Sequence, residues 1–301
     1  MSDSLVSIIV NCFNSERFLK EALDSIYKQD YLNWEIIFWD NASSDGSSEI
    51  AKSYDSRLKY YLAPITTPLG EARNLALEKA KGKYIAFLDC DDKYLPGKIS
   101  KQVDSMESSN IALCYGSALV INENGEILKQ HKLKEDNGYL LNKLLLRYEI
   151  NMQTVMLRSS ILSDNNLSFD LSLQFSPDYD LFMRIASNFK LCALSDFLVE
   201  YRKSENSLTS KMLDRIAPEM EYTLNSLDKK LNKSAKENQN FTKAFQMLNY
   251  YKSLPLIQKG NYKEARKFLY KSTRVRKRYF VYFLFTFFPV KNTWILKKML
   301  S

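Results

Sequence analysis

Acidic side chains follow two predicted strands at the point where each apolar run ends. Asp89, Asp91 and Asp92 end the run over residues 84–88, and Asp40 ends another apolar run. Ligands of an open α/β sheet bind beyond the carboxyl ends of its strands. Strand residues two apart face the same way, so Asp89 and Asp91 are expected to point together into that crevice. Two adjacent oxygen donors suit Mg²⁺ or Mn²⁺, which keeps other coordination positions for phosphate oxygens. The sequence therefore predicts a metal-bridged diphosphate site.

These carboxylates need a sheet to bring them together, and the sequence has the pattern of one. Short β-branched or aromatic runs alternate with helical patterns in the first hundred residues, which is typical of a mainly parallel sheet flanked by helices, the α/β class. A hairpin, a short strand, a helix and a last strand are expected to follow. The expected elements are strands Val6–Val10, Trp34–Trp39, Leu58–Leu62 and Tyr84–Leu88, helix Arg17–Gln29, helical stretches near Ser47–Tyr54 and Gly70–Ala80, hairpin strands Ala118–Asn122 and Ile127–His131, a strand at Thr154–Leu157, a helix from Pro177 and a strand at Leu198–Arg202.

The chain is expected to have two regions. Its 301 residues, 45% of them hydrophobic and 26% charged, are enough for a full globular core. Strand signals stop near residue 210, and helical patterns alone continue beyond it. We therefore expect an α/β domain over residues 1–210 and a helical carboxyl-terminal region over residues 211–301.

The basic charge of the chain is concentrated in residues 271–301. This segment has eight basic residues and no acidic one, which equals the whole net charge of +8. Aromatic residues accompany the cations, and this combination predicts docking on an anionic membrane surface. The alternative is a helix that packs on its own domain and leaves a solvated basic edge. Nucleic acid is not an expected partner, because no groove-reading motif accompanies the charge.

Cysteine usage and the amino terminus predict the cellular compartment. Cys12, Cys90, Cys114 and Cys192 form no CxxC pair, and each lies in or beside an apolar stretch, so buried, reduced thiols are expected. A zinc site is not expected, because His131 is the only histidine. The first strand has no basic leader before it, which favours a cytoplasmic protein, with peripheral attachment to the inner face of the membrane if the basic segment docks there.

Five short motifs occur in an order and spacing that resemble a family 2 glycosyltransferase with the GT-A fold. They cover residues 5 to about 210. The motifs are Asn11-Cys-Phe-Asn14 after the first strand, Asp40-Asn-Ala-Ser-Ser-Asp-Gly46 after the second, Gly70-Glu-Ala-Arg-Asn74, Leu88-Asp-Cys-Asp-Asp92, and Asp178-Tyr-Asp-Leu-Phe-Met-Arg184. The resemblance implies a sheet that binds a nucleoside diphosphate sugar.

The resemblance implies which residues bind the nucleotide sugar. Asp40 is expected to accept a hydrogen bond from a uracil base or a ribose, with a turn-forming role as the alternative. Asn11, Phe13 and Asn14 are assigned to the same site, although the family has proline and tyrosine where this chain has Asn11 and Phe13. Arg73 is expected to approach the diphosphate, with a place on the helix surface as the alternative.

The resemblance also ranks the acids that bind metal. Asp91 is expected to be the principal ligand, with Asp89 nearer the ribose or a metal-bound water, and Asp92 supporting either. The alternative is a loop that is merely rich in acids. Ser204 stands where the family often has a histidine, so this chain must bind metal or phosphate without that group.

Two carboxylates compete for the role of general base. Ser176 and Pro177 have the pattern of an N-cap and a first helical residue, so Asp178 lies in the first turn, where the helix dipole favours its ionised form. Asp178 shares a face with apolar residues and is expected to look inward. Asp180 has Arg184 four residues on, which predicts a surface ion pair. Asp178 is therefore the expected base, with an acid that only stabilises the helix start as the alternative.

Together these features predict an inverting, metal-dependent glycosyltransferase. It is expected to move a sugar from a nucleoside diphosphate sugar, a UDP-sugar by resemblance, to a hydroxyl of a glycan or lipid-linked acceptor in bacterial surface polysaccharide synthesis. Asn151 and Gln153 are the candidates for the acceptor pocket. One alternative is a sugar nucleotidyltransferase, although residues 11–16 lack the glycine-rich loop of such enzymes. The other is a non-catalytic membrane scaffold, against which the intact carboxylates argue.

Overall fold

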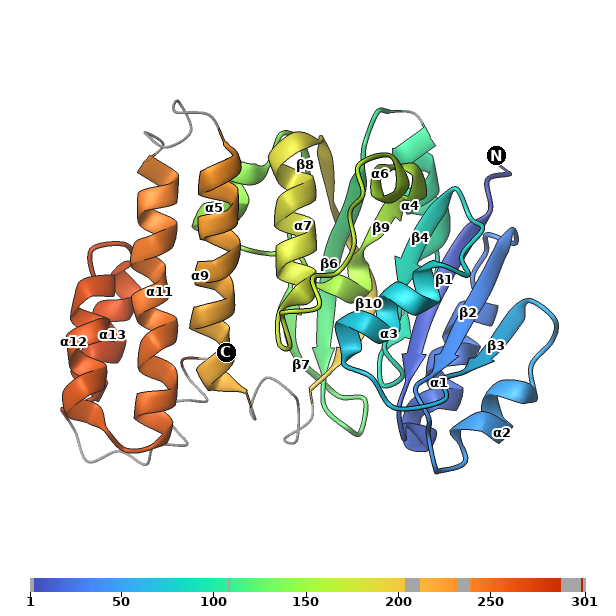
Figure 1. The fold of residues 1–301 in the computed structure, drawn as a ribbon, viewed down its shortest axis with the longest axis horizontal. Helices are drawn as coiled ribbons and strands as arrows, with labels where there is room; N and C mark the ends of the chain where they lie inside the picture. The colour runs from blue at the N-terminus through green and yellow to red at the C-terminus, as the bar shows by residue number, and fades with distance from the viewer. Residues whose placement is uncertain (1–2, 108, 204–211, 232–238, 288–298, 300–301) are drawn as a thin grey trace. The chain divides into compact units, whose positions relative to one another are not determined.

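A computed structural model describes residues 3–107, 109–203, 212–231, 239–287 and 299 (Figure 1). The chain divides into two compact units. Unit 1 comprises residues 1–141 and 149–204, and unit 2 comprises residues 142–148 and 205–301. The boundary expected at residue 210 lies outside the described residues, and the short segment 142–148 joins the second unit.

The described strands of unit 1 form one ten-stranded sheet. Its order is β3-β2-β1-β4-β9-β6-β10-β5, with β7 beside β6 and β8 beside β10. Strands β3, β2, β1 and β4 are parallel, β9 is antiparallel to β4 and β6, and β6 and β10 are parallel again. The strands are β1 Val6–Cys12, β2 Trp34–Asp40, β3 Leu58–Leu62, β4 Tyr84–Phe87, β5 Lys93–Tyr94, β6 Leu113–Ile121, β7 Ile127–His131, β8 Asp136–Gly138, β9 Met156–Arg158 and β10 Leu191–Arg202.

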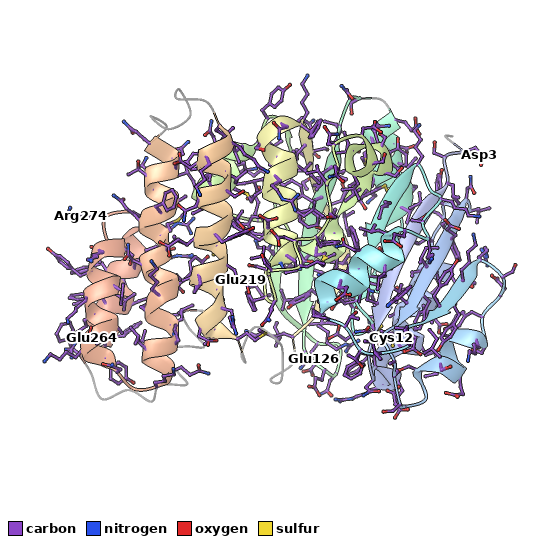
Figure 2. All side chains as sticks on the ribbon, in the orientation of Figure 1. Asp3, Cys12, Glu126, Glu219, Glu264 and Arg274 are labelled. Carbon is purple, nitrogen blue, oxygen red and sulfur yellow. The ribbon has the colours of Figure 1, made fainter. Side chains whose placement is uncertain are left out.

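This topology brings the carboxyl ends of β1, β2, β4, β6 and β10 to one edge of the sheet. Cys12 at the end of β1 and Glu126 in the turn after β6 lie toward the same end of the unit (Figure 2). The strands β1 and β2 are apolar and almost wholly buried, as expected for parallel strands that are covered on both faces. The mainly parallel sheet predicted from the sequence is confirmed.

Helices cover both faces of the sheet. The apolar faces of α1 and α4 pack on the β1 side chains that alternate with Asn11, whereas α3 lies against β1 and β2 on the other face (Figure 1). The helices of unit 1 are α1 Glu16–Tyr27, α2 Ser47–Lys52, α3 Leu69–Leu77, α4 Lys98–Glu107, α6 Ser159–Asp164 and α7 Pro177–Asn188, with a 3₁₀ turn, η1, at Met152–Thr154. The four cysteines are buried and free, as predicted.

Three expected strands differ from the observed ones. The strand expected at Ala118–Asn122 is the second half of β6, which begins at Leu113. The segment expected at Thr154–Leu157 begins with η1, and only Met156–Arg158 is a strand. The strand expected at Leu198–Arg202 is the second half of β10, which begins at Leu191 and pairs with β6 through two register shifts around Phe197. These irregularities interrupt the alternation along β10, and its first half therefore has no clear strand pattern in the sequence.

The α4 side of the core contains a fully buried lysine. Lys98 is 0% exposed, its Nζ donates to Gln102 Oε1 at 2.7 Å, and it lies 4.2 Å from the centroid of the Tyr94 ring. Burial lowers the pKa of Lys98 to about 7, because a low-dielectric interior disfavours the ammonium ion.

Unit 2 is helical where it is described. Its helices are α5 Leu141–Leu146, α9 Leu213–Lys230, α11 Gln239–Gln258, α12 Tyr262–Ser272 and α13 Lys277–Phe285. The turn between α11 and α12 has Gly260 at φ 74°, and Asn261 Oδ1 accepts from the Glu264 N–H at 3.3 Å, which caps α12. Tyr279 of α13 is 1% exposed and stacks on Tyr250 of α11 with a centroid separation of 4.4 Å. No described helix is both long and apolar enough to cross a membrane.

Candidate active site

The residues after β1 form a loop that is bonded to the loop after β2. Asn14 has a left-handed backbone with φ 48°, its Oδ1 accepts from the Ser44 N–H at 2.8 Å, and its own N–H donates to Ser43 Oγ at 3.0 Å. The Phe13 side chain is 51% exposed, which suits a ring that stacks on a ligand. The Asn11 side-chain nitrogen is buried and has no hydrogen-bond partner within the described part of the chain.

Asp40 is the last residue of β2 and is 0% exposed. Its Oδ1 accepts from the Ser43 N–H at 2.8 Å, and its Oδ2 accepts from the Tyr60 hydroxyl at 2.6 Å. Burial and the bond to Asp40 raise the pKa of Tyr60. The structure thus gives Asp40 the turn-forming role that the sequence left open as an alternative. A carboxylate has further lone pairs, so nucleotide binding by Asp40 stays a prediction.

Asp89 is held from two sides. Arg73 Nη2 lies 3.3 Å from Asp89 Oδ1, and Gln153 Nε2 donates to Asp89 Oδ2 at 2.5 Å while Gln153 Oε1 accepts from the Asp89 N–H at 2.8 Å. Arg73 is 5% exposed, so it does not lie on the helix surface. The Asp89 carboxylate itself is 39% exposed and remains open to a ligand.

Asp91 is partly exposed and carries a poorly compensated charge. Burial and the nearby charge of Asp89 raise the pKa of Asp91 to about 6, and Arg202 offsets only part of this effect. Asp89 and Asp91 are therefore close enough to repel each other, although they lie in a turn after β4 and not on the strand itself. A cation between them would remove the repulsion.

Asp92 does not support metal binding in the way the sequence suggested. It is 1% exposed, and its Oδ1 accepts from the backbone N–H of Arg202 at 2.6 Å. Its Oδ2 is buried without a partner among the described residues. Burial and the charges of Asp91 and Asp89 raise the pKa of Asp92 well above its usual range. Asp92 lies inside the fold because β10 passes beside the loop and offers it an amide.

Asp178 lies in the first turn of α7, with Pro177 at the first helical position as predicted. The start of α7 lies close to the start of α3, because a Cβ added to Gly70 would be 3.6 Å from Pro177 Cβ. Arg73 follows one turn further along α3. Burial raises the pKa of Asp178, the Arg73 charge opposes this, and the Asp89 charge adds to it. Asp178, Arg73 and Asp89 thus share one electrostatic environment.

Asp180 is not part of a surface ion pair, contrary to the expectation. It is 1% exposed, and its Oδ2 accepts from Arg184 Nε at 2.7 Å, with the Arg184 side chain only 14% exposed. Arg184 Nη2 also donates to the Ser168 carbonyl at 2.5 Å. The pair is buried because the loop before α7 folds back over this side of the helix, so Asp180 stabilises the fold.

The two acceptor candidates have structural partners. Asn151 Oδ1 accepts from the Gln153 N–H at 2.9 Å and caps η1. The side-chain oxygen and nitrogen of Gln153 are both bonded to Asp89, and the residue is 3% exposed. Gln153 therefore orients Asp89 in this structure rather than facing an acceptor. An acceptor contact by Asn151, which is partly exposed, stays a prediction.

The carboxylates fit a cation that is shared with a ligand. The described residues include no group of three or more His, Cys, Asp or Glu that could hold a metal by themselves. Asp89 and Asp91 are a pair of hard oxygen donors, one of them with a raised pKa. Mg²⁺ and Mn²⁺ sites that serve phosphates use one or two carboxylates and leave the remaining positions to phosphate and water. The donor set therefore suits a metal that binds together with a diphosphate.

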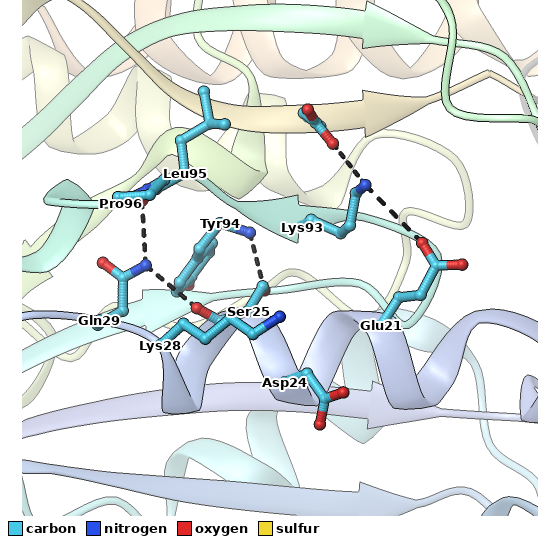
Figure 3. Close-up of a pocket in the computed structure, with 10 residues that line it drawn as sticks. Glu21, Asp24, Ser25, Lys28, Gln29, Lys93, Tyr94, Leu95 and Pro96 are labelled. Atoms are coloured by element: carbon cyan, nitrogen blue, oxygen red, sulfur yellow. Dashed lines mark hydrogen bonds and ion pairs between the residues drawn. The ribbon is translucent and has the colours of Figure 1, made fainter.

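A surface pocket of about 350 Å³ lies beside β5 and contains none of the predicted site residues (Figure 3). Several of its polar side chains already bond to each other or to the backbone. Gln29 Nε2 donates to the Leu95 carbonyl at 3.0 Å, Ser25 Oγ accepts from the Tyr94 N–H at 2.9 Å, and Lys93 pairs with Glu200 at 2.6 Å. We therefore assign this pocket to the packing of α1 against β5 and not to nucleotide binding.

Three residues near the carboxylates were not predicted from the sequence. Tyr60 bonds Asp40 from the neighbouring strand, and Arg202 donates to the loop that holds Asp91 and Asp92. Tyr201 lies near the whole cluster, because its pKa is raised by burial and then by the charges of Asp92, Asp89, Asp91 and Asp178. For Tyr201 and Arg202 the only signal was their position at the end of an expected strand, and Tyr60, in the middle of β3, had none, since partners in other strands cannot be read from local pattern.

Comparisons with known proteins show the family of this chain. A family model described as glycosyl transferase family 2 matches residues 7–164. The chain is 32% identical over 213 residues to the Escherichia coli UDP-Glc:alpha-D-GlcNAc-diphosphoundecaprenol beta-1,3-glucosyltransferase WfgD, covering 70% of this chain and 81% of that protein. It is 34% identical over 210 residues to an uncharacterized glycosyltransferase of Methanocaldococcus jannaschii, covering 67% of this chain and 72% of that protein.

Two solved structures share the fold. Residues 1–349 of TarS from S. aureus, in complex with UDP-GlcNAc, superpose with a TM-score of 0.67 at 19% identity, covering 98% of this chain and 90% of that one. A mannosyltransferase from Pyrobaculum calidifontis, in complex with GDP-Man and Mn2+, superposes with a TM-score of 0.61 at 14% identity, covering 98% and 84%. The ordered motifs, the sheet and the family match together establish that this chain belongs to glycosyl transferase family 2 and has the GT-A fold.

Proposed function

We propose that this glycosyltransferase is metal-dependent and inverting, and that it transfers a sugar from a UDP-sugar to a hydroxyl of a lipid-linked acceptor. The observation that carries the proposal is the shared environment of Asp89, Arg73 and Asp178 at the carboxyl edge of the sheet. One carboxylate pair there suits a metal-bound diphosphate, and a separate carboxylate suits proton transfer. WfgD and the TarS complex, both named with UDP-sugars, support the choice of nucleotide.

Asp178 is the proposed general base. Its raised pKa makes it a stronger base than an exposed carboxylate, and the Arg73 charge favours its ionised form. In this role it accepts the proton of the acceptor hydroxyl as the oxygen attacks the anomeric carbon. The bond from that carbon to the diphosphate breaks on the opposite side, so a single displacement inverts the stereochemistry.

Asp91 and Asp89 are the proposed metal-binding residues, with Asp89 bound directly or through water. When bound, Mg²⁺ or Mn²⁺ supplies Lewis-acid stabilisation of the charge on the departing diphosphate. The neighbour from Pyrobaculum calidifontis, described with Mn2+, supports this choice of ions. Arg73, bonded to Asp89, adds a fixed positive charge near the same phosphates.

A sugar carried on a lipid diphosphate is the proposed acceptor. WfgD is named for transfer to a diphosphoundecaprenol-linked sugar, and this supports an acceptor of the same class and a role in bacterial surface polysaccharide synthesis. Asn151, partly exposed before η1, is the remaining candidate for a hydroxyl contact.

An exposed apolar face on α13 supports work at a membrane surface. Tyr279 packs inward, whereas Phe280, Val281, Leu284 and Phe287 are 41–55% exposed. The exposed cations Lys271, Arg274 and Arg278 lie in the same segment, and each cation near anionic lipid contributes about 1 kcal/mol. Membrane docking and packing on its own domain, the two expectations for this segment, thus both have support. One side of α13 packs on the rest of unit 2, and the other side is exposed. We propose an anionic bilayer, at the inner face of the membrane, as the partner of the exposed side.

Vesicle sedimentation tests the membrane partner. The full chain is expected to bind vesicles that contain phosphatidylglycerol and to be released by high salt, whereas a Phe280→Asp/Leu284→Asp variant is expected to stay in solution. Leu128→Asp, a change at a 56% exposed position on β7, serves as the matched control. Equal binding by the α13 variant and the control would refute the membrane partner and leave the transfer proposal intact.

A panel of sugar nucleotides tests the transfer reaction against its alternatives. With Mn²⁺, the protein is expected to release UDP from one UDP-sugar, and to do so faster when a lipid diphosphate-linked sugar is present. NMR of the product is expected to show an inverted anomeric configuration. Formation of a nucleotide sugar from UTP and a sugar phosphate would instead indicate a nucleotidyltransferase. No turnover and no UDP binding would favour a scaffold. Asp164→Asn, at an exposed position on α6 at the opposite edge of the sheet, is the control for acid removal.

A further inference from the structure

Arg202, the last residue of β10, bonds to the loop that contains the proposed metal ligands. Its Nε donates to the Asp91 carbonyl at 2.8 Å, and its backbone N–H donates to Asp92 Oδ1 at 2.6 Å. Arg202 is 4% exposed, so these bonds are shielded from water. One buried residue therefore fixes both the backbone and a side chain of this loop.

The rest of the Arg202 guanidinium is anchored outside the loop. Nη1 donates to the carbonyls of Asn122 at 3.3 Å and Glu123 at 3.0 Å, in the turn between β6 and β7. Nη2 donates to Glu21 Oε2 at 3.0 Å, and the group lies 4.2 Å from the centroid of the Phe18 ring. Because α1 and the β6–β7 turn hold the guanidinium in place, Arg202 can impose its position on the loop. A lysine could not reproduce this planar set of donors.

Gln153 holds the other end of the same loop. Its side-chain amide bonds both the backbone N–H and the carboxylate of Asp89, and its own backbone N–H is tied to Asn151 Oδ1. Gln153 is buried in η1, and this turn is far in sequence from Arg202 at the end of β10. The loop over residues 89–92 is thus fixed at both ends by groups that are distant in sequence.

The loop has a physical need for such support. Three carboxylates occur within four residues, and their mutual repulsion favours spreading of the loop when no cation is bound. We propose that Arg202 and Gln153 are positioning residues that hold the loop in its metal-binding shape before the cation and the sugar nucleotide arrive. This inference rests on the proposed function. Pre-ordering of this kind improves affinity, because the free energy of binding is not reduced by the cost of ordering the loop.

Mn²⁺ binding in the presence of UDP tests this role directly. Free Mn²⁺ is measured by electron paramagnetic resonance for the full chain and for Arg202→Lys and Gln153→Met. Loss of outer-shell partners typically weakens metal affinity by about 10- to 100-fold, so a loss of at least about tenfold is expected in each variant. The measured kcat should recover toward the wild-type value at high Mn²⁺, because neither residue is proposed to touch the reacting atoms.

Two further variants separate positioning from simple stability. Arg158→Lys alters another partly buried arginine, which donates to the Met106 carbonyl at 2.9 Å at the opposite edge of the sheet. It is expected to lower the melting temperature without changing Mn²⁺ affinity. Glu21→Leu removes an anchor of Arg202 at a side chain that is 53% exposed, so it should leave the protein folded and weaken Mn²⁺ binding, by less than the Arg202 variant does.

The outcomes distinguish this inference from the proposed function. Wild-type protein that binds no Mn²⁺ with UDP would overturn both. Wild-type binding with unchanged affinity in the folded Arg202, Gln153 and Glu21 variants would overturn the positioning role alone.

Discussion

Asp178 and Asp180 lie two residues apart on α7, and their replacement by asparagine should produce opposite phenotypes. Asp178, the proposed base, has a pKa raised by burial and lies near the charges of Arg73 and Asp89. Asp180 has a structural environment, because it is 1% exposed and paired with Arg184 at 2.7 Å. We therefore expect Asp178→Asn to reduce turnover and Asp180→Asn to reduce stability.

The size of each effect follows from the environment. Removal of a positioned base typically costs about 10²- to 10⁴-fold in rate, or about 2.7–5.4 kcal/mol of activation free energy. Asp178→Asn should show this loss in kcat with a melting temperature that is unchanged or slightly higher, because a buried charge is removed. Asp180→Asn leaves the Arg184 cation, 14% exposed, without its counter-charge. Breaking a buried pair costs about 3–5 kcal/mol, and we expect the lower end here, or roughly 6–12 °C in melting temperature.

The two variants are compared by kcat, from steady-state transfer at saturating Mn²⁺, and by melting temperature. Asp164→Asn is the control. The pH profile adds a further check. A base acts in its ionised form, so kcat/KM should fall as the pH drops through the raised pKa of Asp178, at a higher pH than for an exposed carboxylate. Asp178→Asn should lack this acidic limb. A normal Asp178→Asn enzyme, together with a large kcat loss in a folded Asp180→Asn enzyme, would refute the assignment of the base.

Three other changes test separate parts of the structure. Asp91→Asn should abolish Mn²⁺-dependent UDP binding in isothermal titration, and unchanged UDP affinity would show that Asp91 is not the metal ligand. Lys98 has a pKa of about 7 in the folded protein and near 10.5 in the unfolded chain. Between these pH values the unfolded state binds one more proton, so the free energy of unfolding should rise with pH by up to about 1.4 kcal/mol per pH unit. Lys98→Met should remove this slope in urea unfolding at pH 7.5 and 9, and an identical slope in the variant would contradict the buried-lysine explanation. Gly82→Ala should strongly lower the urea midpoint, because its Cβ would lie 2.5 Å from the Ser7 backbone nitrogen, and a wild-type midpoint would contradict this packing.

The elements that carry the site were predictable because their signals are local. Strands β1, β2 and β4 are mainly apolar runs that polar residues follow, and the start of α7 is marked by Ser176 and Pro177. The order of the five motifs was enough to predict the family by resemblance, and their common place follows from a parallel sheet, in which the carboxyl ends of the strands converge. The β6–β7 hairpin was also predicted, from the Asn-Gly turn between two alternating runs.

Tertiary structure decided which way each side chain of the site faces and what it bonds. Asp92 turns inward because β10, 110 residues further along, supplies the amide of Arg202. Gln153 contacts Asp89 from 64 residues away, and Asp180 is buried because the loop before α7 covers it. Periodicity and capping describe residues within one element, whereas burial and hydrogen-bond partners depend on elements that meet only when the chain folds. The sequence by itself was therefore sufficient for strands β1 to β4, the motifs and the family. Strands β5 and β8 and the first halves of β6 and β10 became clear only in the fold, which also separated the open carboxylates from the buried ones.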